Sequence, residues 1–189
     1  SILRLRQSAC HMGMLPGQTT TRSSKVELLM THLESCLAGN HKVLVFSQWT
    51  KFLDLIQARL QKSGLNHLRI DGTTKDRQQI VTTFQTDEHY PILLLSLKAA
   101  GIGLNLTAAD HVFIMDPWWN PAVEDQAADR TYRIGQKKPV MVCKIVTKQT
   151  IEEKIVALQA KKKELMGSVM GQGKHVYQLT RKEILGLLD

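Results

Sequence analysis

The sequence predicts an α/β fold in which a mostly parallel sheet is covered by helices on both faces. Three observations predict it. Short, wholly apolar runs recur along the 189-residue chain, and segments with the periodicity of amphipathic helices separate them. Gly, Asn, Asp or Pro marks most of the boundaries. Because a run that is apolar throughout fits a strand buried on both faces, its alternation with helices is typical of a parallel, three-layer sheet.

The first expected helix begins at Ser24, where Ser24 and Glu27 have the spacing of a capping box. It places Val26, Leu29 and Leu33 on one face. The elements expected to follow are a strand at 43–46, a helix carrying Phe52, Ile56 and Leu60 and stopped by Gly64, a strand at 68–70 and a helix near 75–84.

The same alternation continues beyond residue 90. The expected elements are a strand at 92–95, a Gly-rich turn and short helix at 99–106, a strand at 111–115, a helix from Pro121 to about Tyr132, a strand at 140–146 and a helix behind Thr150 and Glu153. Thr150 and Glu153 form a second capping box. In open sheets of this kind ligands bind beyond the carboxyl ends of the strands, so the segments that follow each strand are the candidate site.

Charge and composition narrow the class of protein. The net charge of +8 and the pI of about 9.5 favour a polyanionic partner such as nucleic acid, although charge alone leaves an ordinary basic protein equally open. Cys10, Cys36 and Cys143 are widely spaced, which predicts neither a disulfide framework nor a zinc ribbon, and the adjacent Cys10 and His11 cannot fill a tetrahedral site alone. We therefore expect no metal there.

The sequence shows no signal peptide and no apolar run of the roughly 20 residues that span a bilayer, which predicts an intracellular protein with no membrane partner. Because the chain opens at Ser1 inside a helical pattern, we expect it to be part of a longer protein. It contains no Gly-x-x-x-x-Gly-Lys-Ser/Thr loop and no Asp-Glu pair after an apolar strand. An ATPase needs both, so the chain alone should not hydrolyse ATP.

Four segments, taken in order, resemble the motifs of SWI/SNF-type DNA-dependent ATPases. The last is Gln126 to Gln136, which reads QAADRTYRIGQ. The others are the FSQW sequence at 46–49, Ile-Asp-Gly at 70–72 and the long block at 94–121, which ends in WWNP. The WWNP and YRIGQ spellings resemble the branch that holds RING-bearing DNA-repair translocases and transcription-termination ATPases.

The resemblance implies a RecA-like second helicase lobe at residues 24–166, preceded by a connecting segment at 1–23 and followed by a linker and bracing helix at 167–189. It implies ATP and Mg²⁺ as cofactors, bound mainly by a first lobe of the same polypeptide. The implied partners are that lobe, double-stranded DNA and chromatin or other DNA-bound proteins, and the implied location is the nucleus in a eukaryote.

The resemblance assigns Arg130 and Arg133 as arginine fingers, with Gln126 either orienting them or bridging to DNA. The two arginines are three apart, so they share a helix face, and a guanidinium supplied by another lobe stabilises the charge that spreads over the γ-phosphate. From the residues alone, ion pairs with Asp125 or Asp129 remain an alternative.

The resemblance also implies nucleotide and DNA contacts. The residues assigned to the ATP-binding cleft are Gly101, Gly103 and Asn105. The residues assigned to DNA are Ser47, Gln48, Lys98, Thr107 and Trp119. The hydroxyls of Thr73 and Thr107 fit turn capping as well as they fit a phosphate contact. Trp118 fits buried packing better than a DNA contact. Lys161–Lys163 fit either a solvated helix face or an added phosphate track.

Three positions depart from the family pattern. Ala100 stands where the family usually has Gly, and Thr131 and Tyr132 replace its Ala and His. Unlike His, Tyr132 cannot take up a proton near neutral pH. Two other functions stay open: a DNA- or protein-interaction module with a vestigial ATPase role, and the lobe of an RNA helicase.

Overall fold

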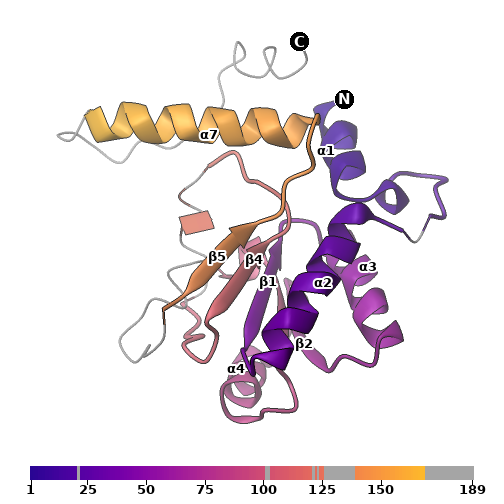
Figure 1. Cartoon of the computed structure of the whole chain (residues 1–189), viewed down its shortest axis with the longest axis vertical. Coiled ribbons are helices and arrows are strands. Elements are labelled where there is room, and N and C mark those ends of the chain that lie inside the picture. Colours follow the sequence, from indigo (N-terminus) through magenta and orange to yellow (C-terminus); the bar gives the residue numbers. More distant parts are fainter. Residues whose placement is uncertain (21, 101–102, 121, 123, 126–138, 169–189) are drawn as a thin grey trace.

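A five-stranded parallel sheet forms the centre of the computed structural model (Figure 1), which describes residues 1–168 except 21, 101–102, 121, 123 and 126–138. The strands are β1 (Val43–Ser47), β2 (His67–Ile70), β3 (Ile92–Ser96), β4 (His111–Ile114) and β5 (Met141–Lys144). The helices are α1 (Ile2–Cys10), α2 (Ser24–Ala38), α3 (Thr50–Lys62), α4 (Arg77–Thr86), α5 (Leu97–Ala100) and α7 (Ile151–Ser168), with a short 3₁₀ turn at Met12–Met14.

The strand order is β2-β3-β1-β4-β5, and every pairing is parallel. β1 lies in the middle, with Val43 opposite both Ile92 of β3 and His111 of β4. β1 and β3 are buried along their whole length, as the apolar runs predict. The predicted α/β fold with a parallel sheet is therefore confirmed. Because all five strands run the same way, the segments after them meet at one edge of the sheet.

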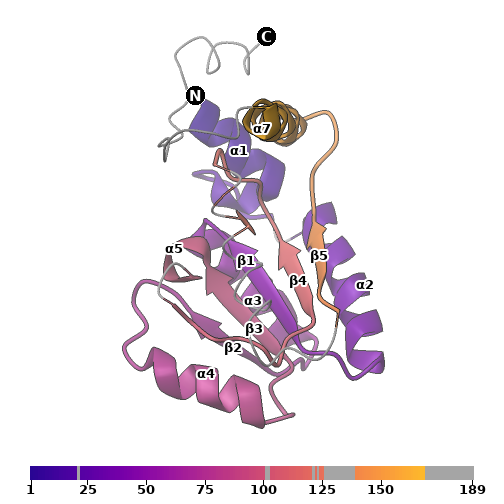
Figure 2. The same ribbon diagram turned by 90° about the vertical axis from the view of Figure 1, so that its left-hand side faces the viewer.

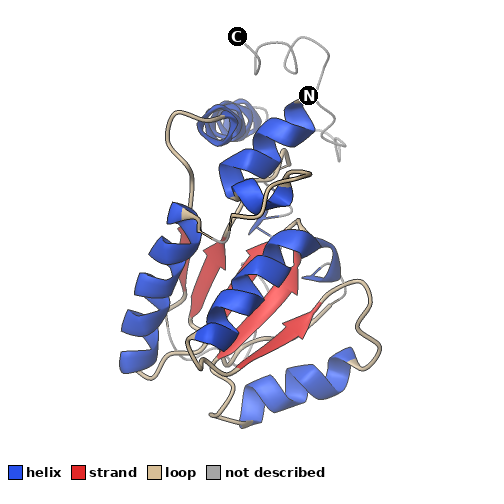
Figure 3. Cartoon of the chain, turned by 90° about the vertical axis from the view of Figure 1, so that its right-hand side faces the viewer, coloured by secondary structure: helices blue, strands red, loops and turns tan. Residues whose placement is uncertain are grey.

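Helices cover both faces of the sheet. α2 and α3 cover one face (Figure 3), where Leu29 of α2 and Phe52 of α3 belong to the same core as Val45 of β1. α4 and the segment around α5 cover the other face (Figure 2), where Phe84 of α4 belongs to the same core as Phe46 of β1. Strand side chains alternate between the faces, so the two cores share the same strands.

The start of α2 differs from its predicted form. The N-cap is Ser23, not Ser24, and its hydroxyl donates to the carbonyl of Cys10 at 3.1 Å rather than capping the helix. Glu27 accepts a bond from Arg59 of α3 at 3.0 Å. The predicted capping box of Ser24 and Glu27 is therefore wrong, because the N-cap hydroxyl and the Glu27 carboxylate both bind groups that are distant in sequence.

The second capping box is confirmed only in part at the start of α7. The hydroxyl of Thr150 caps the helix by accepting from the backbone N–H of Glu152 at 3.2 Å. The carboxylate of Glu153 reaches back one residue further than the reciprocal bond requires, to the N–H of Gln149 at 2.7 Å and not to that of Thr150. At its other end α7 continues through Gly167 to Ser168, where the sequence predicts the start of a linker. The rest of that linker, and the predicted C-terminal helix, lie outside the described residues.

α1 and α7 lie side by side beyond the carboxyl edge of the sheet (Figures 1 and 2). Ile151 and Ile155 of α7 form a small core with Ile2, Ala9 and Trp119. The first segment of the chain is thus packed against the carboxyl edge, close to the candidate site. In the described part of the chain, no helix has the length and apolar character that a membrane crossing requires.

Candidate nucleotide and DNA interface

The carboxyl edge of the sheet brings together several residues that are far apart in the sequence. Ser47 ends β1 and Gln48 follows it, Lys98 lies in the helix after β3, and Trp119 lies in the loop after β4. Gln126, Arg130, Arg133 and Gly101, which the sequence also assigns to this site, lie outside the described residues.

A buried carboxylate links the ends of β1 and β4. The backbone N–H of Gln48 donates to both oxygens of Asp116, at 3.1 and 3.3 Å. Asp116 is 1% exposed, and burial raises the pKa of its carboxyl to about 6, although the bonds from Gln48 and the charges of Lys25 and Arg6 act in the other direction. Asp116 therefore fixes the direction in which Gln48 leaves the strand.

Two side-chain donors at this edge are buried without an acceptor among the described residues. They are the amide nitrogen Nε2 of Gln48 and the indole nitrogen Nε1 of Trp49. A buried donor with no partner costs about 1–3 kcal/mol. An acceptor such as a phosphate oxygen would satisfy such a donor, so this arrangement fits the DNA-backbone contact expected of Gln48.

Ser47 and Thr73 use their hydroxyls within their own turns. Ser47 is buried, and its Oγ accepts from the N–H of Trp49 at 3.0 Å. The hydroxyl of Thr73 donates to Asp71 at 2.6 Å, and this bond is the main cause that lowers the pKa of Asp71. Thr73 therefore matches the turn-capping alternative, and Ser47 supports the loop that carries Gln48.

The segment after β3 places one cation at the surface. Lys98 is exposed on α5, and the N–H of Ala99 donates to the hydroxyl of Ser96 at 3.2 Å. Gly103 follows in the left-handed region at φ +53°, with open space where a Cβ would stand. A glycine is thus favoured here by the backbone conformation and not by crowding. The exposed ammonium group of Lys98 fits a phosphate contact.

Asn105 and Thr107 lie toward the opposite, amino edge of the sheet. The side-chain amide of Gln85, near the end of α4, donates to the carbonyl of Asn105 at 3.2 Å and to the hydroxyl of Thr107 at 3.3 Å. That end of α4 also lies beside Lys42, which donates to the carbonyl of Asp87 just before β1 begins. The structure therefore does not place Thr107 with Ser47 and Gln48.

The three tryptophans of the chain surround one guanidinium. Arg6 is buried, and its guanidinium carbon lies 4.6 Å from the ring centroid of Trp119. The corresponding distances are 5.5 Å to Trp49 and 5.8 Å to Trp118. Arg6 also donates to the carbonyl of Pro117 at 3.1 Å. Cation–π contact thus ties α1 to the loop that holds Trp118 and Trp119, here named the Trp-Trp loop. The sequence did not reveal this role of Arg6.

A buried ion pair lies beside this group. The ammonium of Lys25 donates to Glu152 at 2.5 Å and to the carbonyl of Met115 at 2.8 Å. The other oxygen of Glu152 accepts from the thiol of Cys10 at 3.4 Å, and desolvation raises the pKa of that thiol well above its usual value. The N–H of Thr147 also donates to Glu152 at 2.9 Å. The Lys25–Glu152 pair and the groups bonded to it thus join α1, α2, the end of β4 and α7.

Sequence reasoning missed Asp116, Arg6, Lys25 and Glu152. One signal was present for Asp116, because it directly follows an apolar strand at the edge where ligands bind. Lys25 and Glu152 sit in the first turns of amphipathic helices, where a charged residue is normally solvated, so nothing in the local pattern marks them as buried.

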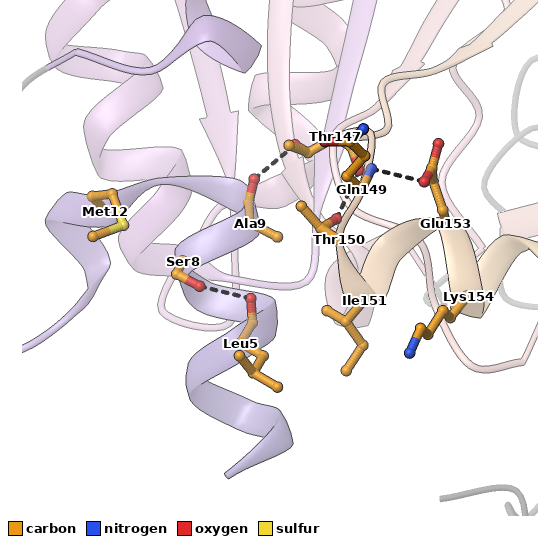
Figure 4. A pocket seen from close by; sticks show the side chains of 10 residues that line it. All are labelled: Leu5, Ser8, Ala9, Met12, Thr147, Gln149, Thr150, Ile151, Glu153 and Lys154. Carbon is orange, nitrogen blue, oxygen red and sulfur yellow. Dashed lines mark hydrogen bonds between the residues drawn. The ribbon is translucent and has the colours of Figure 1, made fainter. Parts of the chain in front are cut away.

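A hollow of about 570 Å³ between α1 and α7 lies apart from the four sequence motifs (Figure 4). Its wall runs from Leu5 to Met12 on one side and from Thr147 to Lys154 on the other. The hydroxyl of Thr147 bridges the two sides by donating to the carbonyl of Ala9 at 2.8 Å. No described residue of those motifs lines the hollow, so we do not take it as the candidate site.

The conserved helicase C-terminal domain matches residues 24–135, which is more than half of the chain. The chain belongs to that family, in its SWI/SNF-type, RAD5-like branch. Its parallel sheet flanked by helices is the RecA-like fold of such a lobe.

Two relatives and one solved structure illustrate the match. The DNA repair protein RAD5A of Arabidopsis thaliana is 44% identical over 150 residues, which cover 78% of this chain and 15% of the relative. An uncharacterized ATP-dependent helicase of Schizosaccharomyces pombe is 40% identical over 190 residues, covering 97% and 18%. The crystal structure of the C-terminal part of the Fun30 ATPase domain superposes with a TM-score of 0.72 and 36% identity, covering 83% of this chain and 54% of that one.

The chain spans less than a fifth of the length of these curated relatives. It is a helicase C-terminal domain of the kind found in SNF2-family ATP-dependent helicases and repair proteins.

Proposed function

We propose that this lobe is the second motor half of an ATP-driven, double-stranded DNA translocase that remodels protein–DNA complexes in the nucleus. The observation that carries the proposal is the buried side-chain nitrogen Nε2 of Gln48, which has no acceptor among the residues that the structure describes. Asp116 holds the backbone N–H of Gln48 at the carboxyl edge of the sheet, and the same edge presents Lys98. Membership of the SWI/SNF-type helicase family supplies the context.

In this proposal the lobe contributes contacts and charge. Gln48 and Lys98 hold phosphates of the DNA backbone, while Ser47 and Asp116 shape the loop behind Gln48. Thr107 takes a structural part through Gln85. Trp119, held by Arg6, presents the Trp-Trp loop toward the duplex. Contacts of this kind position the protein and carry no sequence information, so the lobe should bind many duplexes alike.

ATP and Mg²⁺ are bound mainly by a first lobe of the same polypeptide. Arg130 and Arg133 of this lobe reach the γ-phosphate when the two lobes close, with Gln126 orienting them and Gly101 and Gly103 lining the cleft. A planar guanidinium neutralises charge on the transferring phosphoryl group, and such a finger contributes roughly a thousandfold or more in rate. Cycles of closing and opening then move the lobes along the duplex.

Duplex binding by this chain tests the DNA part of the proposal. We expect weak binding that falls steeply with salt, with a slope of about 0.9 in log K against log salt for each phosphate that the protein neutralises. Lys98→Ala should reduce the size of the slope by about 0.9, the value for one phosphate contact. Gln48→Ala should weaken binding with little change in the slope. Lys62→Ala, which removes an exposed lysine at the far end of α3, is the matched control.

The opposite outcome is equally clear. Binding that does not depend on salt, a preference for RNA over duplex DNA, or equal losses for Lys62→Ala and Lys98→Ala would contradict the proposed interface.

A further inference from the structure

Two histidines and one aspartate form a compact group at the amino edge of the sheet, on the side opposite the candidate DNA interface. His41 lies in the turn before β1, and Asp110 and His111 stand at the start of β4. One ligand atom from each lies within 4.8 Å of the others, and in the described part of the chain no other group of His, Cys, Asp and Glu does this.

The carboxylate of Asp110 organises the group. Its two oxygens are each 2.8 Å from the ring nitrogen Nδ1 of one histidine, Oδ2 from His41 and Oδ1 from His111. The two imidazole rings lie 4.4 Å apart between centroids. Asp110 is 2% exposed, and its carboxylate faces both rings.

The backbone around the group is fixed from three sides. The N–H groups of Asp110 and His111 donate to the carbonyl of Lys42, at 3.2 and 3.4 Å, and the N–H of Met141 donates to the carbonyl of Asp110 at 2.8 Å. The N–H of His41 donates to the carbonyl of Cys36 at the end of α2. Donor atoms held by rigid elements need little reorganisation to bind a ligand.

Solvent reaches the group from one side. A hollow of about 540 Å³ is lined by His41, Asp110, His111 and residues 139–141. The side chain of His41 is 37% exposed and that of His111 is 15% exposed. The site thus has both an inner anionic anchor and an entry path.

We propose that His41, Asp110 and His111 bind a divalent transition-metal ion of the zinc class, with solvent completing its coordination. Two imidazoles and one carboxylate are a ligand set that zinc uses, at about 2.0–2.2 Å from the metal. Two atoms bound to one tetrahedral ion are therefore roughly 3.3 Å apart. In the structure the Nδ1 atom of each histidine is 2.8 Å from a carboxylate oxygen of Asp110, and no two of the three ligand atoms are more than 4.8 Å apart. The expected spacing of roughly 3.3 Å lies between these values, so small rotations of the imidazole rings would bring the three ligand atoms into tetrahedral positions.

The ion would have a structural role and not a catalytic one. His41 belongs to the turn between α2 and β1, whereas Asp110 and His111 begin β4, so one ion would fasten two neighbouring strands of the sheet at their amino ends. Ligand binding to the folded state alone raises stability in proportion to the logarithm of ligand concentration over its dissociation constant. This assignment is independent of the proposed motor function.

Cobalt and zinc titrations of this chain test the proposal. We expect one equivalent of Co²⁺ to give the visible absorption of a tetrahedral ion, and zinc to displace it. His41→Ala and His111→Ala should each weaken zinc binding at least about tenfold, since even changes to groups behind the ligands have that effect. At the same zinc concentration, zinc should raise the Tm of the wild type by more than that of His41→Ala. His41 is the most exposed of the three, so its replacement disturbs the folded core least.

His89→Ala is the matched control, because His89 also pairs through Nδ1 with one carboxylate, that of Asp87 at 3.1 Å, but is exposed and belongs to no such three-residue group in the described part of the chain. It should bind zinc as the wild type does. The proposal is overturned if the wild type shows no saturable binding, if His41→Ala and His111→Ala bind as tightly as His89→Ala, or if a sulfur-to-cobalt charge-transfer band shows that cysteines hold the ion.

Discussion

The N–H of Gln48 donates to both carboxylate oxygens of Asp116, which joins the end of β1 to the end of β4. The ladder between these strands already ends just before, with the N–H of Met115 donating to the carbonyl of Phe46 at 2.9 Å. The bonds between Gln48 and Asp116 therefore continue the contact between β1 and β4 beyond the last backbone hydrogen bond, into the loops that follow the two strands. It places a buried, ionisable group directly behind the residue proposed to touch DNA.

The first prediction concerns the pH dependence that Asp116 creates. Its folded pKa of about 6 is above the ordinary 3.8, so the folded state holds this proton more tightly than the unfolded state. Its contribution to stability is therefore full below about pH 4 and is lost as the pH rises through about 6, by an amount on the order of 3 kcal/mol. Urea unfolding of Asp116→Asn should lack this fall, so the wild type should lose stability relative to the variant between about pH 4 and 6.

Asp71→Asn is the control for that prediction, because the pKa of Asp71 is lowered and not raised. Its contribution is present above pH 3.8 and disappears as the pH falls below that value. A wild-type curve that stays parallel to that of Asp116→Asn across the range from about pH 4 to 6 would show that Asp116 does not carry the raised pKa.

A second prediction concerns the buried pair of Lys25 and Glu152, whose side chains are both 2% exposed. Lys25→Met leaves Glu152 buried without its cation, which should cost about 3–5 kcal/mol in the free energy of unfolding. The double variant Lys25→Met with Glu152→Gln should recover part of that loss, because the uncompensated charge is gone. Chemical denaturation at neutral pH measures all three proteins.

The exposed pair of Arg59 and Glu27, 3.0 Å apart, offers the comparison. Arg59→Ala should cost less than about 1 kcal/mol. Equal losses for Lys25→Met and Arg59→Ala would mean that burial does not distinguish the two pairs.

A third prediction concerns Arg6 and tryptophan fluorescence. All three tryptophans of the chain lie around this guanidinium, so the intrinsic tryptophan emission reports on this group alone. Arg6→Ala should shift the emission to longer wavelength and lower stability by about 2 kcal/mol, the value of a desolvated cation–π contact. Arg6→Lys should recover little of the wild-type emission or stability, since an ammonium lacks the planar face that stacks on a ring.

Arg4→Ala, which changes an exposed arginine on the same helix, should leave the spectrum unchanged. If Arg6→Ala keeps the wild-type emission, the guanidinium does not order the Trp-Trp loop and its role in presenting Trp119 fails.

The strands and helices could be predicted from the sequence because their signals are local. The apolar runs at 43–46 and 92–95 mark strands buried on both faces, and both are strands in the structure. The capping box at Ser24 failed because the helix starts from Ser23, which binds Cys10, and because Glu27 binds Arg59. A local pattern cannot report such competition from residues distant in sequence.

The site was predicted in part for the same reason. Motif spelling indicated Gln48 and Lys98, and the parallel sheet then brought them to one edge. Arg6 lies 111 residues from the carbonyl it binds, and His41 lies 69 residues from Asp110. No spacing rule connects such residues, so only the folded chain shows the tryptophan group and the histidine–aspartate cluster.

The central claim is that Arg133 completes an ATPase site formed with a first lobe, and the rate of ATP hydrolysis by the full-length parent protein tests it most directly. We expect duplex DNA to stimulate the wild type, and Arg133→Ala to lose roughly a thousandfold of that rate while still binding ATP, with the exposed Arg22→Ala as a wild-type-like control. An Arg133→Ala protein that hydrolyses ATP at the wild-type rate with DNA present would contradict the account.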